Sequence, residues 1–115
     1  MIFFKLILDD EDIEYLEEFP FGYSKEIPLG AKCAIYGFGA YGKKTLLNLM
    51  SKALIENIYD QNYDVLNNDV RDPLKLSGDN IDYIFITVIN KPGLNSAINF
   101  LLQQGIEKEK FVFIR

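Results

Sequence analysis

The chain has 115 residues, of which 49% are hydrophobic and 25% charged, a composition typical of one globular domain. Its net charge of −5 argues against nucleic acid as a partner, because a phosphate backbone needs a basic protein face. No segment approaches the ~20 apolar residues that span a bilayer, and the apolar start leads into acidic residues without a cleavage site, so we expect a soluble, cytoplasmic protein with no membrane partner.

We assign residues 1–26 to an N-terminal extension and residues 27–115 to the main domain. Residues 1–8 are apolar and indicate a strand, and residues 10–18 indicate a helix that ends before a proline. The extension carries most of the acidic charge, whereas residues 19–115 are nearly neutral, with ten acidic and eleven basic side chains. The aromatic side chains after this helix are expected to cover one edge of the core, or alternatively to form a dimer contact: Phe19, Phe21 and Tyr23.

Residues 32–50 hold the motif around which the rest of the chain is arranged. An apolar strand, residues 33–36, precedes the spacing G-x-G-x-x-G and a helix with one apolar side, which is the context of a dinucleotide-binding fingerprint. Gly37 permits a tight turn, Gly39 lets the backbone approach a pyrophosphate, and Gly42 lets the helix pack closely on the strand. The start of the helix then offers N–H groups to an anion. The apolar side of the helix is expected to consist of Gly42, Leu46, Leu49, Met50 and Ala53.

Residues 54–60 predict a second strand that ends in an acid. Asp60 follows Gly42 by 18 residues, close to the position at which a dinucleotide-binding domain places the acid that accepts hydrogen bonds from ribose hydroxyls. The alternative is a turn aspartate before the polar residues that follow. Residues 61–80 are rich in turn formers and predict at most a short extended piece around Val65 or Val70 and a turn of helix over residues 72–76.

Residues 81–89 form an almost continuous apolar run, which predicts a central strand buried on both faces. Pro92 suits the first turn of the next helix, Gly105 ends that helix, and residues 111–114 predict a last strand. This order of elements predicts an α/β fold, a Rossmann-like parallel sheet with helices on both faces, truncated relative to a full dinucleotide-binding domain.

Ligands of such sheets bind outside the carboxyl ends of the strands, where the strand order reverses. Three predicted segments converge there: the glycine loop at residues 37–42, Asp60, and the loop at residues 87–92. We therefore predict that the ligand contacts Gly37, Phe38, Gly39, Ala40, Tyr41, Gly42, Asp60, Thr87, Val88 and Asn90.

Four segments resemble a small Rossmann-like domain of bacterial surface-polysaccharide pathways: IPLGAKCAIYGFGAYGKKTLLNL, IYDQNYD, DYIFITVIN and INFLLQQGIEKEKFVFI. That domain is appended to glycosyltransferases and methyltransferases and accompanies nucleotide-sugar epimerase/dehydratase enzymes. The resemblance covers residues 27–115, and residues 1–21 have no counterpart in it. It implies binding of NAD or a nucleotide sugar, with binding positions at Gly37, Gly39, Gly42 and Asp60.

Catalytic chemistry is sparse in this sequence. The chain has no histidine, which removes the commonest general acid or base, and with a single cysteine no zinc site is expected. No tyrosine is followed four residues later by lysine, so the Tyr-x-x-x-Lys pair of the sugar epimerases is missing. We predict a non-catalytic or regulatory nucleotide-binding module. The alternatives are a fragment or subunit of a nucleotide-sugar oxidoreductase, epimerase or methyltransferase, which would need a partner enzyme chain, and a ligand-free adaptor that forms a homodimer.

Overall fold

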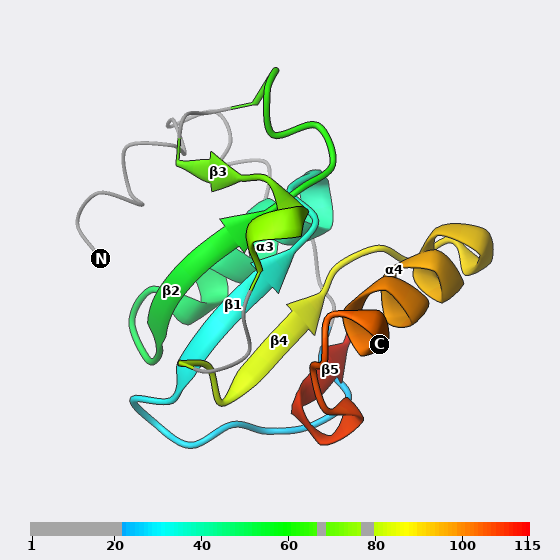
Figure 1. The fold of residues 1–115 in the computed structure, drawn as a ribbon. Helices are drawn as coiled ribbons and strands as arrows, with labels where there is room; N and C mark the ends of the chain where they lie inside the picture. Colours follow the sequence, from blue (N-terminus) through cyan, green and yellow to red (C-terminus); the bar gives the residue numbers. More distant parts are fainter. Residues whose placement is uncertain (1–21, 67–68, 77–79) are drawn as a thin grey trace.

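The computed structural model describes residues 22–66, 69–76 and 80–115, and these form a five-stranded parallel sheet with the order β3-β2-β1-β4-β5 (Figure 1). The strands are β1 (Lys32–Tyr36), β2 (Leu54–Tyr59), β3 (Val70–Arg71), β4 (Tyr83–Ile86) and β5 (Phe111–Phe113). The helices are α3 (Ala40–Leu49) and α4 (Lys91–Gln103), with short 3-10 turns η1 (Pro73–Lys75) and η2 (Lys108–Lys110). The predicted Rossmann-like α/β fold is confirmed.

The two helices cover opposite faces of the sheet (Figure 1). Side chains alternate along β1, so Cys33 and Ile35 point to one face and Ala34 and Tyr36 to the other. The first face packs against α3 through Leu46 and Leu49, together with Ile58 and Phe85. The second packs against α4 through Ala97 and Leu101, together with Ile84 and Ile86. Because both faces are buried, β4 carries no charged residue, in agreement with the apolar run predicted over residues 81–89.

The central strands end in register at one edge of the sheet. Tyr36, the last residue of β1, pairs with Tyr59 of β2 on one side and with Ile86 of β4 on the other. Three carboxyl ends therefore lie side by side, and the loops that follow them share one edge of the molecule. Between β1 and β4 the chain reverses the direction in which it adds strands, which makes this the topological switch point of the sheet.

Several predicted boundaries differ from those in the structure. The strand expected over residues 81–89 covers only β4, because the pairing of β4 with β1 ends where Ile86 lies opposite Tyr36, the last residue of β1. Met50 and Ala53 follow the end of α3 instead of lying on it, although Ala53 is still buried in the core. Of the two places considered for a short extended piece, Val70 lies in β3, whereas Val65 is exposed.

Residues 22–24 attach the start of the described chain to the free edge of β5. Tyr23 forms an antiparallel bridge with Ile114, and Ser24 N donates to Phe113 O at 2.8 Å. The Tyr23 ring meets Phe85 edge-on, with 5.1 Å between centroids, so the predicted cover over one edge of the core is confirmed for this tyrosine. The other predictions for the extension, a strand over residues 1–8 and a helix over residues 10–18, lie outside the described residues.

Tyr23 should stabilise the fold through its hydroxyl as well as its ring. The hydroxyl donates to Thr45 Oγ1 at 3.3 Å and accepts from Asn48 Nδ2 at 2.8 Å, so Tyr23→Phe leaves two polar groups of α3 without this partner. We expect the variant to lose about 1 kcal/mol of unfolding free energy in urea titrations. The matched control is Tyr63→Phe, which removes a hydroxyl hydrogen-bonded to Asp72 on an exposed loop and should change stability much less. Equal losses in the two variants would contradict a specific role for Tyr23.

Candidate functional site

The glycine turn, residues 37–42, joins β1 to α3 at the switch point of the sheet. Gly37 has a φ of +100°, a conformation that favours glycine, and a Cβ placed on it would lie 2.6 Å from Thr87 Oγ1. A Cβ placed on Gly42 would lie 2.1 Å from Gly37 O, a distance that no side chain tolerates. These two glycines are therefore required by the fold, one for the turn and the other for the close approach of helix and strand.

Gly39 lies in open space. Its φ is −83°, which any residue can adopt, and a Cβ placed on it would meet no atom of the described residues within 4 Å. It is the N-cap residue of α3, and within the described ranges no side chain caps this end of the helix. The fold thus gives no steric reason for glycine at position 39, whereas the motif gives one, the close approach of a pyrophosphate, which stays a prediction.

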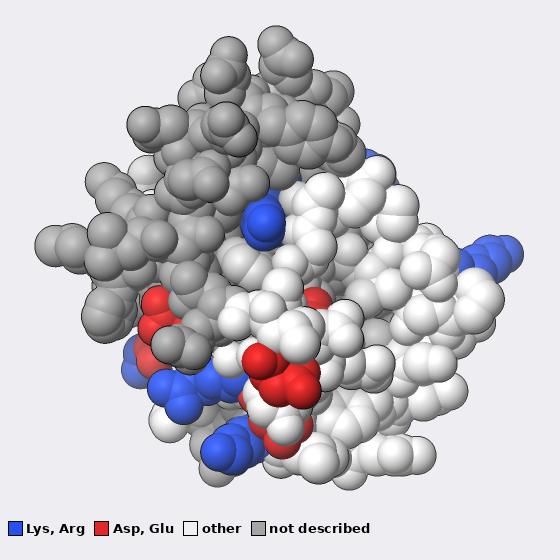
Figure 2. All heavy atoms as spheres, turned by 90° about the horizontal axis from the view of Figure 1, so that it is seen from above, with Lys and Arg blue, Asp and Glu red and all other residues white. Residues whose placement is uncertain are grey.

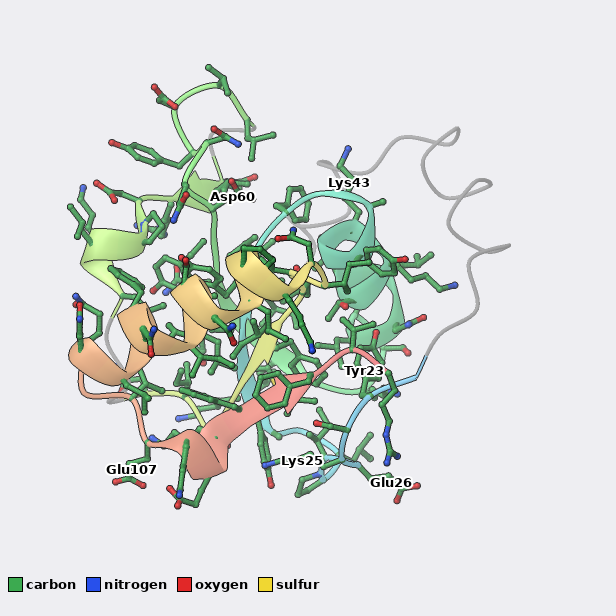
Figure 3. The ribbon with its side chains drawn as sticks, turned by 90° about the vertical axis from the view of Figure 1, so that its right-hand side faces the viewer. Tyr23, Lys25, Glu26, Lys43, Asp60 and Glu107 are labelled. Atoms are coloured by element: carbon green, nitrogen blue, oxygen red, sulfur yellow. The ribbon has the colours of Figure 1, made fainter. Side chains whose placement is uncertain are left out.

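Asp60 directly follows β2 and binds two backbone N–H groups. Phe38 N donates to Asp60 Oδ2 at 2.6 Å, and Asn62 N donates to Asp60 Oδ1 at 2.8 Å. The carboxylate therefore ties the glycine turn to the loop after β2. A carboxylate can accept about four hydrogen bonds, so Asp60 keeps capacity for a ribose hydroxyl. Figure 3 shows Asp60 and Lys43 at one end of the molecule, with Lys25, Glu26 and Glu107 toward the other.

A pocket of about 310 Å³, which we call the edge pocket, opens beside Asp60 on the α4 side of the sheet. Its walls come from the end of β1, the loop after β2, the loop after β4 and the first half of α4. The lining residues are Tyr36, Gly37, Asp60, Gln61, Asn62, Val88, Gly93, Ser96 and Ala97. Gly93, Ser96 and Ala97 lie on one side of α4 at helical spacing, and their small size leaves the volume of the pocket open. The volume is at the lower end of the range for small-ligand pockets.

Tyr36 forms part of the wall of the edge pocket. Its ring packs near Phe100 of α4, with 6.1 Å between centroids, and its hydroxyl is hydrogen-bonded to the side chain of Gln61. Burial raises the pKa of Tyr36, the hydrogen bond to Gln61 lowers it by less, and the negative charge of Asp60 raises it further. The phenol consequently stays protonated at neutral pH.

The structure places the predicted contact residues in three kinds of position. Gly37, Asp60 and Val88 line the edge pocket, and residues 39–42 form the adjoining turn and start of α3. Of the remaining three, Phe38 and Thr87 are buried, whereas Asn90 is exposed. Phe38 is 3% exposed in the core on the α3 face, the Thr87 hydroxyl faces the carbonyls of Tyr36 and Gly37, and Asn90 Oδ1 caps α4 by accepting from Gly93 N at 2.8 Å.

Sequence reasoning missed most of the α4 wall and part of the β2 side. The missed lining residues are Tyr36, Gln61, Asn62, Gly93, Ser96 and Ala97. A signal for the α4 wall existed, because small residues at positions 93, 96 and 97 share one side of a helix. Nothing in the local pattern showed that this side faces the end of β1 instead of a filled core.

The described surface at this end of the molecule is largely uncharged, and charged side chains of both signs gather over one part of it (Figure 2). Within the described ranges, no group of three or more acidic or cysteine side chains is placed to hold a metal ion. Neither α3 nor α4 has the length and apolar content of a membrane-spanning helix.

The steric difference between the glycines predicts different effects on stability. Gly42→Ala should lower the unfolding free energy by about 2–4 kcal/mol, because the new methyl group collides with the Gly37 carbonyl. Gly39→Ala is the matched control and should change stability by less than about 1 kcal/mol, because its methyl group enters open space. Urea unfolding of both variants measures the difference, and similar losses would contradict the close contact at Gly42.

Comparisons of this chain with protein-family models, with curated proteins and with solved structures find no match. The fold assignment consequently rests on the strand order and helix placement described above, and the resemblance to a polysaccharide-pathway domain stays a prediction.

Proposed function

We propose that this domain binds the nucleoside diphosphate part of NAD or of a nucleotide sugar, and that it acts as a binding or regulatory module without catalysing a reaction. One observation carries the proposal. At the switch point of the sheet, Asp60 is bonded to a glycine turn and borders a pocket of about 310 Å³. Open parallel sheets bind their ligands at this position.

The parts of the site suit the parts of such a ligand. The edge pocket would hold the nucleoside, with its ribose against Asp60. The phosphates would lie over Gly39, where the space above the backbone is open and the uncapped start of α3 presents N–H groups. Lys43, in the first turns of α3 with its ammonium 6.0 Å from the Phe38 ring centroid, adds positive charge near the same turn.

The side chains that line the edge pocket are better suited to binding a ligand than to catalysing a reaction. A general acid or base at neutral pH works best with a pKa near 7. Burial moves the pKa of Tyr36 upward and therefore away from that range, and the Asp60 carboxylate is engaged by two N–H groups. The other polar lining groups, from Gln61, Asn62 and Ser96, bind hydrogen-bonding partners but do not titrate near neutral pH.

The resemblance of residues 27–115 to a polysaccharide-pathway domain supports a role for this module in the synthesis of bacterial surface polysaccharides. There the module would act in the cytoplasm beside a sugar-modifying enzyme, where nucleotide sugars are made. The partner enzyme would supply the catalytic groups that the edge pocket does not offer.

A thermal-shift and calorimetric screen tests the proposal with NAD, NADP, ADP, UDP-glucose and S-adenosylmethionine. A ligand that binds the folded state stabilises it by about 2.7 kcal/mol at a hundredfold excess over its Kd. We expect a response to NAD, UDP-glucose or both, and a weaker one to NADP, because its extra phosphate would approach Asp60. A response to S-adenosylmethionine alone would favour the methyltransferase alternative. The absence of any response would overturn the proposal and favour the adaptor.

Gly39→Val tests whether phosphates lie over the turn. The side chain fills the open space above the backbone, so we expect at least a tenfold loss of affinity for the ligand found in the screen with little change in melting temperature. Ser51→Val, in the exposed turn beyond the other end of α3, is the control and should leave the affinity unchanged. Undiminished binding by Gly39→Val would exclude a pyrophosphate at this position.

Asp60→Asn tests the carboxylate. An amide has only one acceptor oxygen, so it cannot accept from Phe38 N and Asn62 N through two separate oxygens. We expect roughly tenfold weaker binding of NAD and less discrimination against NADP, measured by calorimetry. The control is Asp82→Asn, since Asp82 Oδ2 also accepts a backbone N–H, from Lys32 at 2.9 Å, but at the opposite edge of the sheet. Equal effects of the two variants would contradict a role for Asp60 in the site.

A further inference from the structure

Thr87 places a buried hydroxyl at the switch point of the sheet. The residue follows β4 directly and is 6% exposed. Its Oγ1 lies 2.9 Å from Tyr36 O and 3.0 Å from Gly37 O, and its own N–H donates to Tyr36 O at 3.0 Å. Burial of a hydroxyl is costly unless it is hydrogen-bonded. Here the single hydroxyl proton is shared between the two carbonyls that lead from β1 into the glycine turn.

The Gly37–Phe38 peptide is held at both of its polar ends. A trans peptide is planar, with C=O and N–H on opposite sides. The carbonyl of Gly37 faces the Thr87 hydroxyl at 3.0 Å, and the N–H of Phe38 donates to Asp60 Oδ2 at 2.6 Å. A peptide beside a glycine can rotate more freely than others, because no Cβ hinders it. The two hydrogen bonds select one orientation of this peptide.

We propose that Thr87 is a positioning residue of the nucleotide site, which acts on Asp60 through the Gly37–Phe38 peptide. The Thr87 hydroxyl fixes the carbonyl, the carbonyl fixes the direction of the Phe38 N–H, and this N–H anchors the Asp60 carboxylate at the border of the edge pocket. Thr87 thus serves the site without touching the ligand, in contrast to the contact role predicted from the sequence. The effect on affinity rests on the proposed function, whereas the effect on the peptide does not.

Two variants separate the hydroxyl from the shape of the side chain. Thr87→Val removes the hydroxyl and keeps the volume, and Thr87→Ser keeps the hydroxyl. The matched control is Thr45→Val, because Thr45 is also fully buried but its hydroxyl accepts from Tyr23. All three are compared with the wild-type chain by amide NMR without ligand and by calorimetry with NAD and with ADP.

We expect the Phe38 amide proton to lie downfield in the wild type, as a short hydrogen bond to a carboxylate requires, and to move upfield in Thr87→Val but not in Thr87→Ser or Thr45→Val. The affinity for NAD or ADP should fall about tenfold in Thr87→Val and recover in Thr87→Ser. A Phe38 amide signal that stays in place in Thr87→Val overturns the proposal. So does a loss of affinity that Thr45→Val shares.

A measurement on the wild type keeps the test decisive if Thr87→Val does not fold. The Thr87 hydroxyl proton should exchange slowly with water and show a nuclear Overhauser effect to the Hα protons of Gly42, because a Cβ on Gly42 would lie 3.2 Å from Thr87 Oγ1. Fast exchange of this proton overturns the proposal. If the wild type binds none of NAD, ADP and UDP-glucose, the proposed ligand is wrong, and the amide and hydroxyl signals still decide the role of Thr87 in the turn.

Discussion

The contact between Gly37 and Gly42 is the constraint on which the candidate site depends. Because a Cβ on Gly42 would lie 2.1 Å from the Gly37 carbonyl oxygen, α3 can begin directly against the end of β1 only when position 42 has no side chain. This contact brings the start of α3 to the carboxyl edge of the sheet. The carbonyl that lies against Gly42 belongs to the same peptide whose N–H donates to Asp60, so the packing of the two glycines and the polar groups of the site meet at one peptide.

The shape of the edge pocket follows from the turns after β2 and from the small residues of α4. Residues 61–66, which follow β2, form turns, and Gln61 and Asn62 from these turns supply part of the pocket wall. On the opposite side, α4 presents small residues toward the end of β1. The resulting volume of about 310 Å³ suits a nucleoside within the pocket and phosphates outside it, over the turn. This division is what the proposed binding of a nucleoside diphosphate requires.

Three side chains that the sequence pattern suggested as ligand contacts make contacts within the protein. Phe38 fills the core on the α3 face, Asn90 caps α4, and Thr87 holds the glycine turn. The Asp60 carboxylate joins two loops and still has acceptor capacity for the proposed ligand. Residues near a binding loop often make such contacts within the protein, because the backbone of a tight turn has polar groups that need hydrogen-bond partners.

The sequence by itself determined the class of fold, the glycine turn and the acid after the second strand. These features are local: apolar periodicity marks strands and helices over a few residues, and the spacing of glycines reports a turn that other residues cannot form. Only the tertiary structure decided that β4 stops at Ile86, that the Thr87 hydroxyl meets a carbonyl 50 residues earlier, and that small residues of α4 face the end of β1. Each of these depends on which distant segments pack together, and a pattern confined to neighbouring residues does not contain that information.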